Sequence, residues 1–152
     1  MKPVVMLADA NVFLRFLRND QPQHSPAARQ LLEAAGAGRV QLQVPEIVVA
    51  DIFYTLTAPM MKVPCAAAAR QLSALLGQPG IELENRHRIF NILALCETRN
   101  IDYGDAALMV AAQSASPQLP IVTFDRDFAG VPGLTAFSPM EWLQKGSKLL
   151  QS

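Results

Sequence analysis

The chain has 152 residues, of which 51% are hydrophobic and 17% are charged, and its formal net charge at pH 7 is zero. This composition is typical of a folded globular domain and excludes a disordered chain, which combines few apolar residues with a high net charge. A net charge of zero also excludes a strongly basic nucleic-acid-binding domain, although a bound cation can supply positive charge instead.

The first elements of the chain are predicted from the spacing of its apolar residues. The apolar run 4–7 predicts a strand that is buried on both faces, and the spacing of apolar residues over 11–18 predicts a helix. Ser25 and Pro26 are typical of a helix start, with Ser25 as the N-cap, and this second helix is expected to run to Gly36.

The remainder of the chain continues the alternation of short strands with helices. The predicted strands are 40–44, 81–84, 120–124 and 133–137. The predicted helices are 46–57, 64–76, 85–99, 102–114 and a short one that follows the capping signature of Ser138 and Glu141.

This alternation predicts an α/β fold, a three-layer domain with a mainly parallel central sheet of about four to five strands and helices on both faces. Because no repeat or domain boundary is visible, residues 1–145 are expected to form a single domain, and 146–152 a flexible tail. In such a sheet the carboxyl ends of parallel strands meet at one edge, where ligands bind.

Cysteine and histidine usage gives no pattern typical of a metal site. Cys65 and Cys96 stand far apart and are accompanied only by His24 and His87, which argues against zinc and favours buried, reduced thiols. No apolar run approaches the roughly 20 residues of a membrane-spanning helix. Asp9 also interrupts the first apolar run too early for a signal peptide. We therefore expect a cytoplasmic protein without membrane association.

Four aspartates stand where a parallel sheet would bring them to one edge. Asp9 and Asp125 directly follow predicted strands, and Asp51 and Asp105 lie near the starts of predicted helices. Each has an ordinary explanation alone, as a helix cap, a dipole partner, a turn residue or an ion-pair partner. Together, four carboxylates repel one another unless a cation shares them. Oxygen ligands without His or Cys favour Mg²⁺ or Mn²⁺.

The segments that carry these aspartates resemble the PIN domain family, and within it the toxin ribonucleases of bacterial VapBC-type toxin–antitoxin pairs. The similar segments are LADANVFLR at 7–15, VPEIVVAD at 44–51, IDYGDAAL at 101–108 and VTFDRDF at 122–128. The resemblance implies a Mg²⁺- or Mn²⁺-dependent endoribonuclease that cleaves single-stranded RNA. It also implies a homodimer and, for a toxin, a small antitoxin protein as partner.

The resemblance also implies roles for individual residues. The acidic cluster that binds the metal and catalyses cleavage would consist of Asp9, Asp51, Asp105 and Asp125. Asn11 and Thr123 match polar positions that support this cluster. The second acidic position of the family is usually Glu, and Asp51 is shorter by one methylene. We therefore expect Asp51 to reach the metal through water or to act as a base.

Positive and aromatic residues around the motifs have more than one interpretation. The candidates for contacts with RNA phosphates are Arg15, Arg18 and Arg126, which are equally compatible with solvated surface charges. The aromatic side chains near the first two motifs are predicted to be core or dimer contacts rather than base-stacking platforms: Phe13, Phe16, Phe53 and Tyr54.

Two other functions are compatible with part of the pattern. A PIN-like domain weakened at Asp51 would serve as an RNA-binding or protein-interaction module. A phosphatase-type enzyme also places an aspartate after the first strand, but a haloacid-dehalogenase-type site needs a second aspartate two residues later, where this chain has Asn11. No lysine stands where a receiver-like domain needs one. The sequence therefore favours a ribonuclease.

Overall fold

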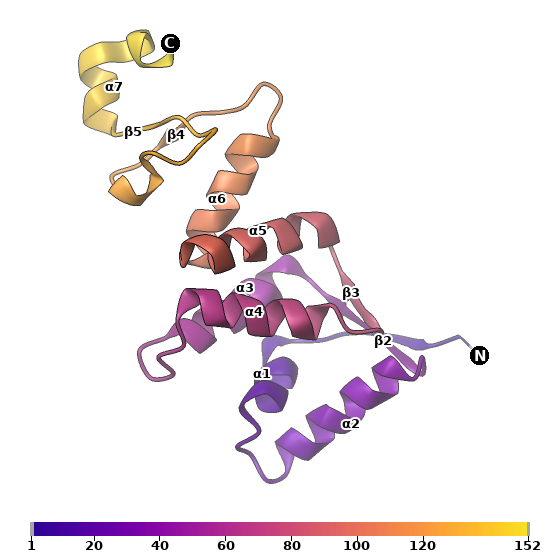
Figure 1. The fold of residues 1–152 in the computed structure, drawn as a ribbon. Helices are drawn as coiled ribbons and strands as arrows, with labels where there is room; N and C mark the ends of the chain where they lie inside the picture. Colours follow the sequence, from indigo (N-terminus) through magenta and orange to yellow (C-terminus); the bar gives the residue numbers. More distant parts are fainter. Residues whose placement is uncertain (1, 152) are drawn as a thin grey trace. The chain divides into compact units, whose positions relative to one another are not determined.

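The computed structural model describes residues 2–151. These residues form seven α-helices, two 3₁₀ helices and five strands, and every strand pair is parallel (Figure 1). This arrangement confirms the predicted α/β class. The chain divides into a first compact unit that ends at Gly104 and a second that begins at Asp105. The predicted single domain stays a prediction.

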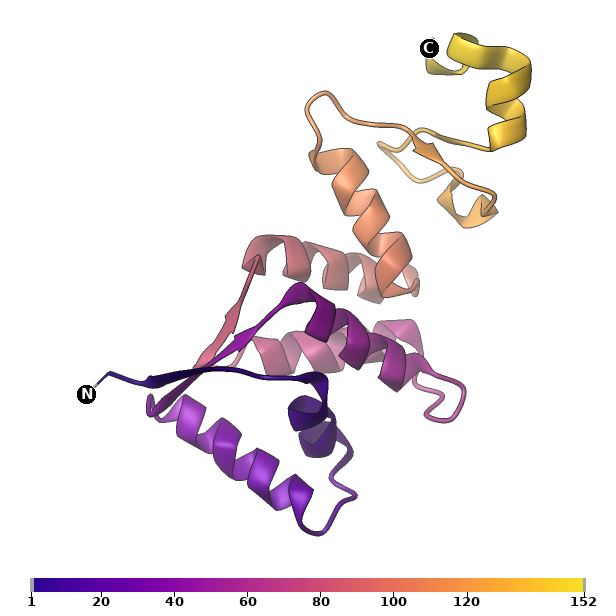
Figure 2. The same cartoon turned by 180° about the vertical axis from the view of Figure 1, so that it is seen from behind.

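The first unit holds a three-stranded parallel sheet in the order β1-β2-β3 (Figure 2). Its elements are β1 (Val4–Leu7), α1 (Ala10–Arg18), α2 (His24–Gly36), β2 (Val40–Val44), α3 (Glu46–Thr57), α4 (Cys65–Leu76), β3 (Ile81–Leu83) and α5 (Arg86–Arg99). Because the strands are parallel, their carboxyl ends share one edge of the sheet. The first aspartate motif follows β1 at this edge, and α3 begins immediately after β2.

The second unit is smaller and contains a two-stranded parallel sheet. Its elements are β4 (Ile121–Val122), η1 (Arg126–Phe128), β5 (Ala136–Phe137), α7 (Pro139–Lys145) and η2 (Gly146–Leu150), and α6 (Tyr103–Ser114) leads into it. The predicted capping box is present, since Ser138 and Glu141 each accept the other's backbone N–H. These two hydrogen bonds hold the pKa of the Glu141 carboxyl below its usual value.

The core of the first unit lies on one face of its sheet. Leu42 and Val44 point to this face and are buried, whereas Gln43 between them is exposed. Phe13 of α1 and Phe53 of α3 are completely buried, which confirms their predicted place in the core.

None of the helices formed by residues 2–151 has the length and apolar character needed to cross a membrane.

Strand β1 is less buried than its sequence predicts. The exposed fractions are 61% for Val4, 53% for Val5, 37% for Met6 and 74% for Leu7. In the first unit β1 is the edge strand and has β2 as its only neighbouring strand among the described residues. Within the first unit the prediction of a strand buried on both faces is therefore wrong, because an apolar run cannot distinguish a central strand from an edge strand.

Ser25 does not cap α2, so the predicted start of this helix is also wrong. The helix begins at His24, and Gln23 occupies the N-cap position without a side-chain hydrogen bond. Ser25 is buried inside the first turn, where its hydroxyl donates to the Arg15 carbonyl (2.8 Å) and accepts from the Gln21 N–H (3.1 Å). Its hydroxyl thus links α2 to the end of α1, a tertiary role that local sequence does not indicate.

Candidate functional site

Asp9 lies where β1 gives way to α1. The residue after β1 is still hydrogen-bonded to β2, because the Ala8 N–H donates to the Gln43 carbonyl (3.0 Å). Asp9 then caps α1, with its Oδ1 accepting from the Asn11 N–H (3.0 Å). The side chain is exposed and this bond engages one of its two oxygens. Asp9 is therefore a helix cap that still presents a carboxylate to solvent at the sheet edge.

Asp51 lies in the second turn of α3 and is exposed. Its neighbours Ile52 and Phe53 are completely buried, so they fix the rotation of α3 and turn Asp51 outward. The Thr55 hydroxyl donates to the backbone carbonyl of Asp51 (2.8 Å), which leaves the carboxylate out of that bond. The exposed position explains how a charge is tolerated within an apolar helical stretch.

Glu46 is the other carboxylate on α3, and it has a structural role. Its Oε1 accepts from Arg88 Nε (3.0 Å) and from the Tyr103 hydroxyl (3.4 Å), while the Glu46 N–H donates to Glu84 Oε1 (3.0 Å). Burial and then the negative charge of Glu46 raise the pKa of the Tyr103 hydroxyl, which stays protonated and donates. Glu46 is engaged in this network, so it is no substitute for Asp51.

Asp105 lies in the first turn of α6 and is half-buried. The start of this helix is held by α3, because the Tyr54 hydroxyl accepts from the Gly104 N–H (2.7 Å) and donates to Asp102 Oδ1 (3.4 Å). A Cβ at Gly104 would stand 2.7 Å from the Tyr54 oxygen, so a larger residue here would displace the Tyr54 hydroxyl. Tyr54 therefore fixes the backbone immediately before Asp105.

Replacing Tyr54 by Phe is expected to lower the free energy of unfolding by about 1 kcal/mol, because two hydrogen bonds at the start of α6 are lost. The measurement is urea unfolding followed by circular dichroism. Gly104→Ala provides a control, since its added Cβ conflicts with the Tyr54 oxygen. The two substitutions should be less destabilising in combination than their sum, and simple additivity would contradict this account.

Asp125 and Thr123 lie in the second unit, in the turn after β4. The Asp125 N–H donates to the Thr123 Oγ1 (2.9 Å), and Asp125 Oδ1 accepts from the Asp127 N–H (2.8 Å) to cap η1. Asp125 is exposed. Thr123 thus supports the backbone of Asp125, and the backbone N–H of Asp127 completes the cap.

The predicted cluster is divided between the two units. Asp9 and Asp51 belong to the first unit, and Asp105 and Asp125 belong to the second. Within residues 2–151 no group of three or more His, Cys, Asp or Glu side chains is positioned to hold a metal ion. The four-residue metal cluster therefore stays a prediction, and the structure describes the local support of each member.

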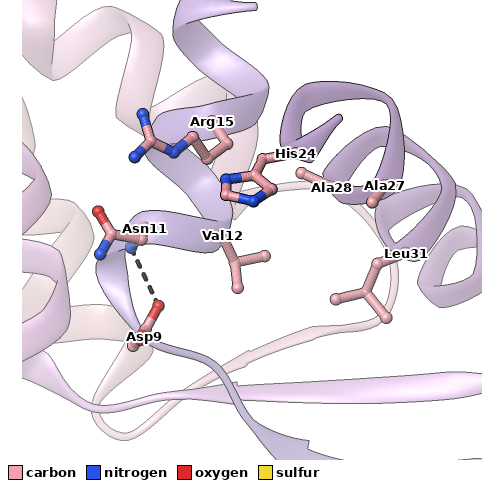
Figure 3. A pocket seen from close by; sticks show the side chains of 8 residues that line it. All are labelled: Asp9, Asn11, Val12, Arg15, His24, Ala27, Ala28 and Leu31. Atoms are coloured by element: carbon pink, nitrogen blue, oxygen red, sulfur yellow. Dashed lines mark hydrogen bonds between the residues drawn. The ribbon is translucent and has the colours of Figure 1, made fainter. Parts of the chain in front are cut away.

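A pocket of about 410 Å³ opens beside Asp9, between α1 and α2 (Figure 3). One side of the pocket is formed by residues at and near the start of α1: Asp9, Asn11, Val12 and Arg15. Helix α2 lines it with His24, Ala27, Ala28 and Leu31. His24 is not among the predicted site residues. No local signal indicates it, because His24 reaches the pocket through the packing of α2 against α1.

The predicted RNA-binding arginines differ in their surroundings. Arg18 is paired with Asp20 (3.0 Å). Arg15 lines the pocket and forms no salt bridge with a carboxylate among the described residues. Arg126 is exposed in η1, beside Asp125. Arg15 therefore shares a pocket wall with Asp9.

Comparison with known proteins identifies the family. A family model of the PIN domain matches residues 6–134, which include all four aspartate motifs. The chain belongs to the PIN domain family. No curated protein matches this PIN domain in sequence.

Two solved structures are similar to this PIN domain. One is a toxin–antitoxin complex from Klebsiella pneumoniae, with 21% identity over 85% of this chain and 94% of that chain, and a TM-score of 0.32. The other is VapBC2 from Rickettsia felis bound to a DNA fragment from their promoter, with 17% identity over 89% of this chain and 98% of that chain, and a TM-score of 0.35.

The donor chemistry of this PIN domain fits a hard divalent cation. The side chains in question are carboxylates, and Mg²⁺ and Mn²⁺ prefer oxygen ligands. Asp9, Asp51 and Asp125 are exposed, so binding a cation would not require a buried carboxylate to be opened first. Two of them are already oriented by a backbone N–H, as ligands of a metal site commonly are.

Proposed function

We propose that this PIN domain is a Mg²⁺- or Mn²⁺-dependent endoribonuclease that cleaves single-stranded RNA. The observation that carries the proposal is that the matched region, 6–134, contains an aspartate in each of the four motifs: Asp9, Asp51, Asp105 and Asp125. These residues would hold the cation, which lowers the pKa of bound water and offsets charge on the phosphate.

The chain's own groups have distinct roles in this hydrolysis. The Asn11 N–H holds the Asp9 carboxylate, and Thr123 holds the turn that carries Asp125. Asp51 is the shorter acid of the set and would either reach the cation through a bound water or accept the proton of the attacking water. Arg15, close to Asp9 in the pocket wall, would pair with a phosphate of the RNA backbone.

The direct test is cleavage of a panel of single-stranded RNAs by the purified protein. Cleavage should require Mn²⁺ or Mg²⁺, stop when EDTA is added, and return when Mn²⁺ is restored in excess. Circular dichroism in EDTA should show an unchanged fold, because the hydrogen bonds that orient Asp9 and Asp125 need no metal. Absence of cleavage across the panel with either cation would overturn the proposal.

We further propose that the protein is the toxin of a toxin–antitoxin pair, that it acts in the cytoplasm as a homodimer, and that a small antitoxin protein inhibits it. The motifs at 7–15, 44–51, 101–108 and 122–128 support this proposal through their resemblance to VapC-type toxins. Expression should arrest growth, and co-expression of a short neighbouring reading frame should relieve the arrest. Light scattering of the purified protein should give twice the chain mass.

Replacing Asp51 by Glu is expected to raise the cleavage rate about tenfold, because the added methylene lets the carboxylate reach the cation directly. Asp51 is exposed on α3, so the longer side chain meets no packing restriction. The measurement is the initial rate at saturating Mn²⁺. Asp20→Glu, at an exposed residue outside the predicted cluster, provides a control. A rate for Asp51→Glu equal to or below the original would contradict direct ligation.

A second candidate function is favoured by Asp51 itself. A PIN domain with a short acid at this position would bind RNA or protein without cleaving. Calorimetry with Mn²⁺ discriminates between the nuclease and the non-catalytic module. Binding that Asp9→Asn removes supports the nuclease, whereas no binding by a folded protein supports the non-catalytic module.

A further inference from the structure

We propose that the pocket between α1 and α2 binds one nucleobase of the RNA substrate, next to the phosphate held at Asp9. This inference rests on the proposed ribonuclease function, which places RNA at Asp9. Asp9 is part of the pocket wall, so a strand bound at this carboxylate has the pocket within reach of an adjoining nucleotide. The pocket, about 410 Å³, falls within the roughly 300–1,000 Å³ typical of small-ligand sites.

The walls of the pocket suit the flat, largely apolar face of a nucleobase. Val12, Ala27 and Leu31 give it apolar walls, against which the flat face of a base can lie (Figure 3). His24 adds an imidazole ring from the first turn of α2. Aromatic and apolar surfaces that accept any base are how proteins hold single-stranded nucleic acid without strict sequence preference.

The charges around the pocket favour a nucleotide over an apolar peptide side chain. Arg15 forms no salt bridge among the described residues, so its guanidinium is available for a phosphate. Asn11 and Asp9 add hydrogen-bonding groups on the same side. An apolar side chain would contact the apolar walls but form no hydrogen bond or ion pair with these polar groups. A base with its phosphate would interact with both the walls and the polar groups.

The test fills the pocket without altering any charge. Ala27 is exposed at the pocket wall, and Ala27→Leu should occupy the space intended for the base. Gln30→Leu places the same side chain at an exposed position of α2 outside the pocket lining and serves as the matched control. The probe is a fluorescein-labelled 12-nucleotide single-stranded RNA, measured by anisotropy with Ca²⁺ in place of Mn²⁺, so that a cation still bridges Asp9 and the phosphate, and gels of the same samples verify that the RNA stays intact.

A set of the same RNA with one base removed at each position in turn identifies the contact. Ala27→Leu should weaken binding about tenfold, the range expected for losing one stacked base, and Gln30→Leu should leave binding unchanged. One abasic position should weaken binding by the original protein by a similar factor and have little effect on Ala27→Leu. Thermal unfolding of both variants verifies that they are folded.

The outcomes separate this inference from the proposed function. If the original protein cleaves RNA but Ala27→Leu binds and cleaves equally well, the nucleobase pocket is wrong and the nuclease stands. If Ala27→Leu instead loses only binding to an antitoxin, the pocket is a protein site and the inference is again wrong. If the original protein binds RNA with this pocket dependence but does not cleave, the pocket stands and the nuclease is wrong.

Discussion

Asp9→Asn is expected to abolish metal-dependent RNA cleavage, lowering kcat by at least about 100-fold. Substituting residues that merely orient metal ligands typically costs about 10- to 100-fold, so loss of a direct ligand should cost more. An amide at this position keeps the shape of the side chain but removes the negative charge that attracts the cation. The measurement is single-turnover cleavage of a labelled RNA over a range of Mn²⁺ concentrations.

The same substitution should leave the fold nearly intact. Asn is as good an N-cap as Asp, and its Oδ1 can still accept the Asn11 N–H. The remaining loss is the attraction between the carboxylate and the positive end of α1, which is worth less than about 1 kcal/mol at an exposed site. Asp20→Asn, which breaks only the surface pair with Arg18, is the control and should cleave normally. Equal activity of Asp9→Asn and Asp20→Asn would remove Asp9 from the site.

Asp9 illustrates what local sequence is able to predict. Its position after an apolar run and before an amphipathic stretch predicts a strand, a cap and a helix, and all three are observed. The same is true of Ser138 at the start of α7. These caps are formed by side chains that bond to backbone only a few residues away, so the local sequence predicts them where no distant group competes for the same side chain.

Features that depend on distant neighbours were less predictable. An apolar strand has the same sequence pattern whether it has one neighbouring strand or two, so the sequence does not indicate that β1 is exposed. Ser25 has the signature of a cap but bonds across to α1 instead. The engagement of Glu46 with Arg88 joins residues 42 positions apart, and no spacing rule indicates it. His24 entered the pocket in the same way, through helix packing.

Phe53→Ala is expected to lower the free energy of unfolding by about 3–5 kcal/mol, a large part of the roughly 5–15 kcal/mol typical of a domain. Phe53 is completely buried, and its ring contacts those of Tyr54 (5.8 Å between centroids) and Tyr103 (6.0 Å). The lost contacts and the resulting cavity both destabilise the fold. Urea unfolding measures the change, and Ile47→Ala, at a 68% exposed position of α3, should change it by less than about 0.5 kcal/mol.

Phe53→Ala also distinguishes the contribution of α3 to stability from its contribution to RNA cleavage. Asp51 and Phe53 lie two residues apart on this helix, with Asp51 exposed and Phe53 buried. Phe53→Ala should therefore lose cleavage only as the protein unfolds, with activity and circular dichroism falling together on heating. Asp9→Asn should show the opposite, an inactive protein that unfolds near the original temperature. If the folded fraction of Phe53→Ala were inactive at low temperature, the ring would have to orient Asp51 directly, and α3 would be more than a rigid support.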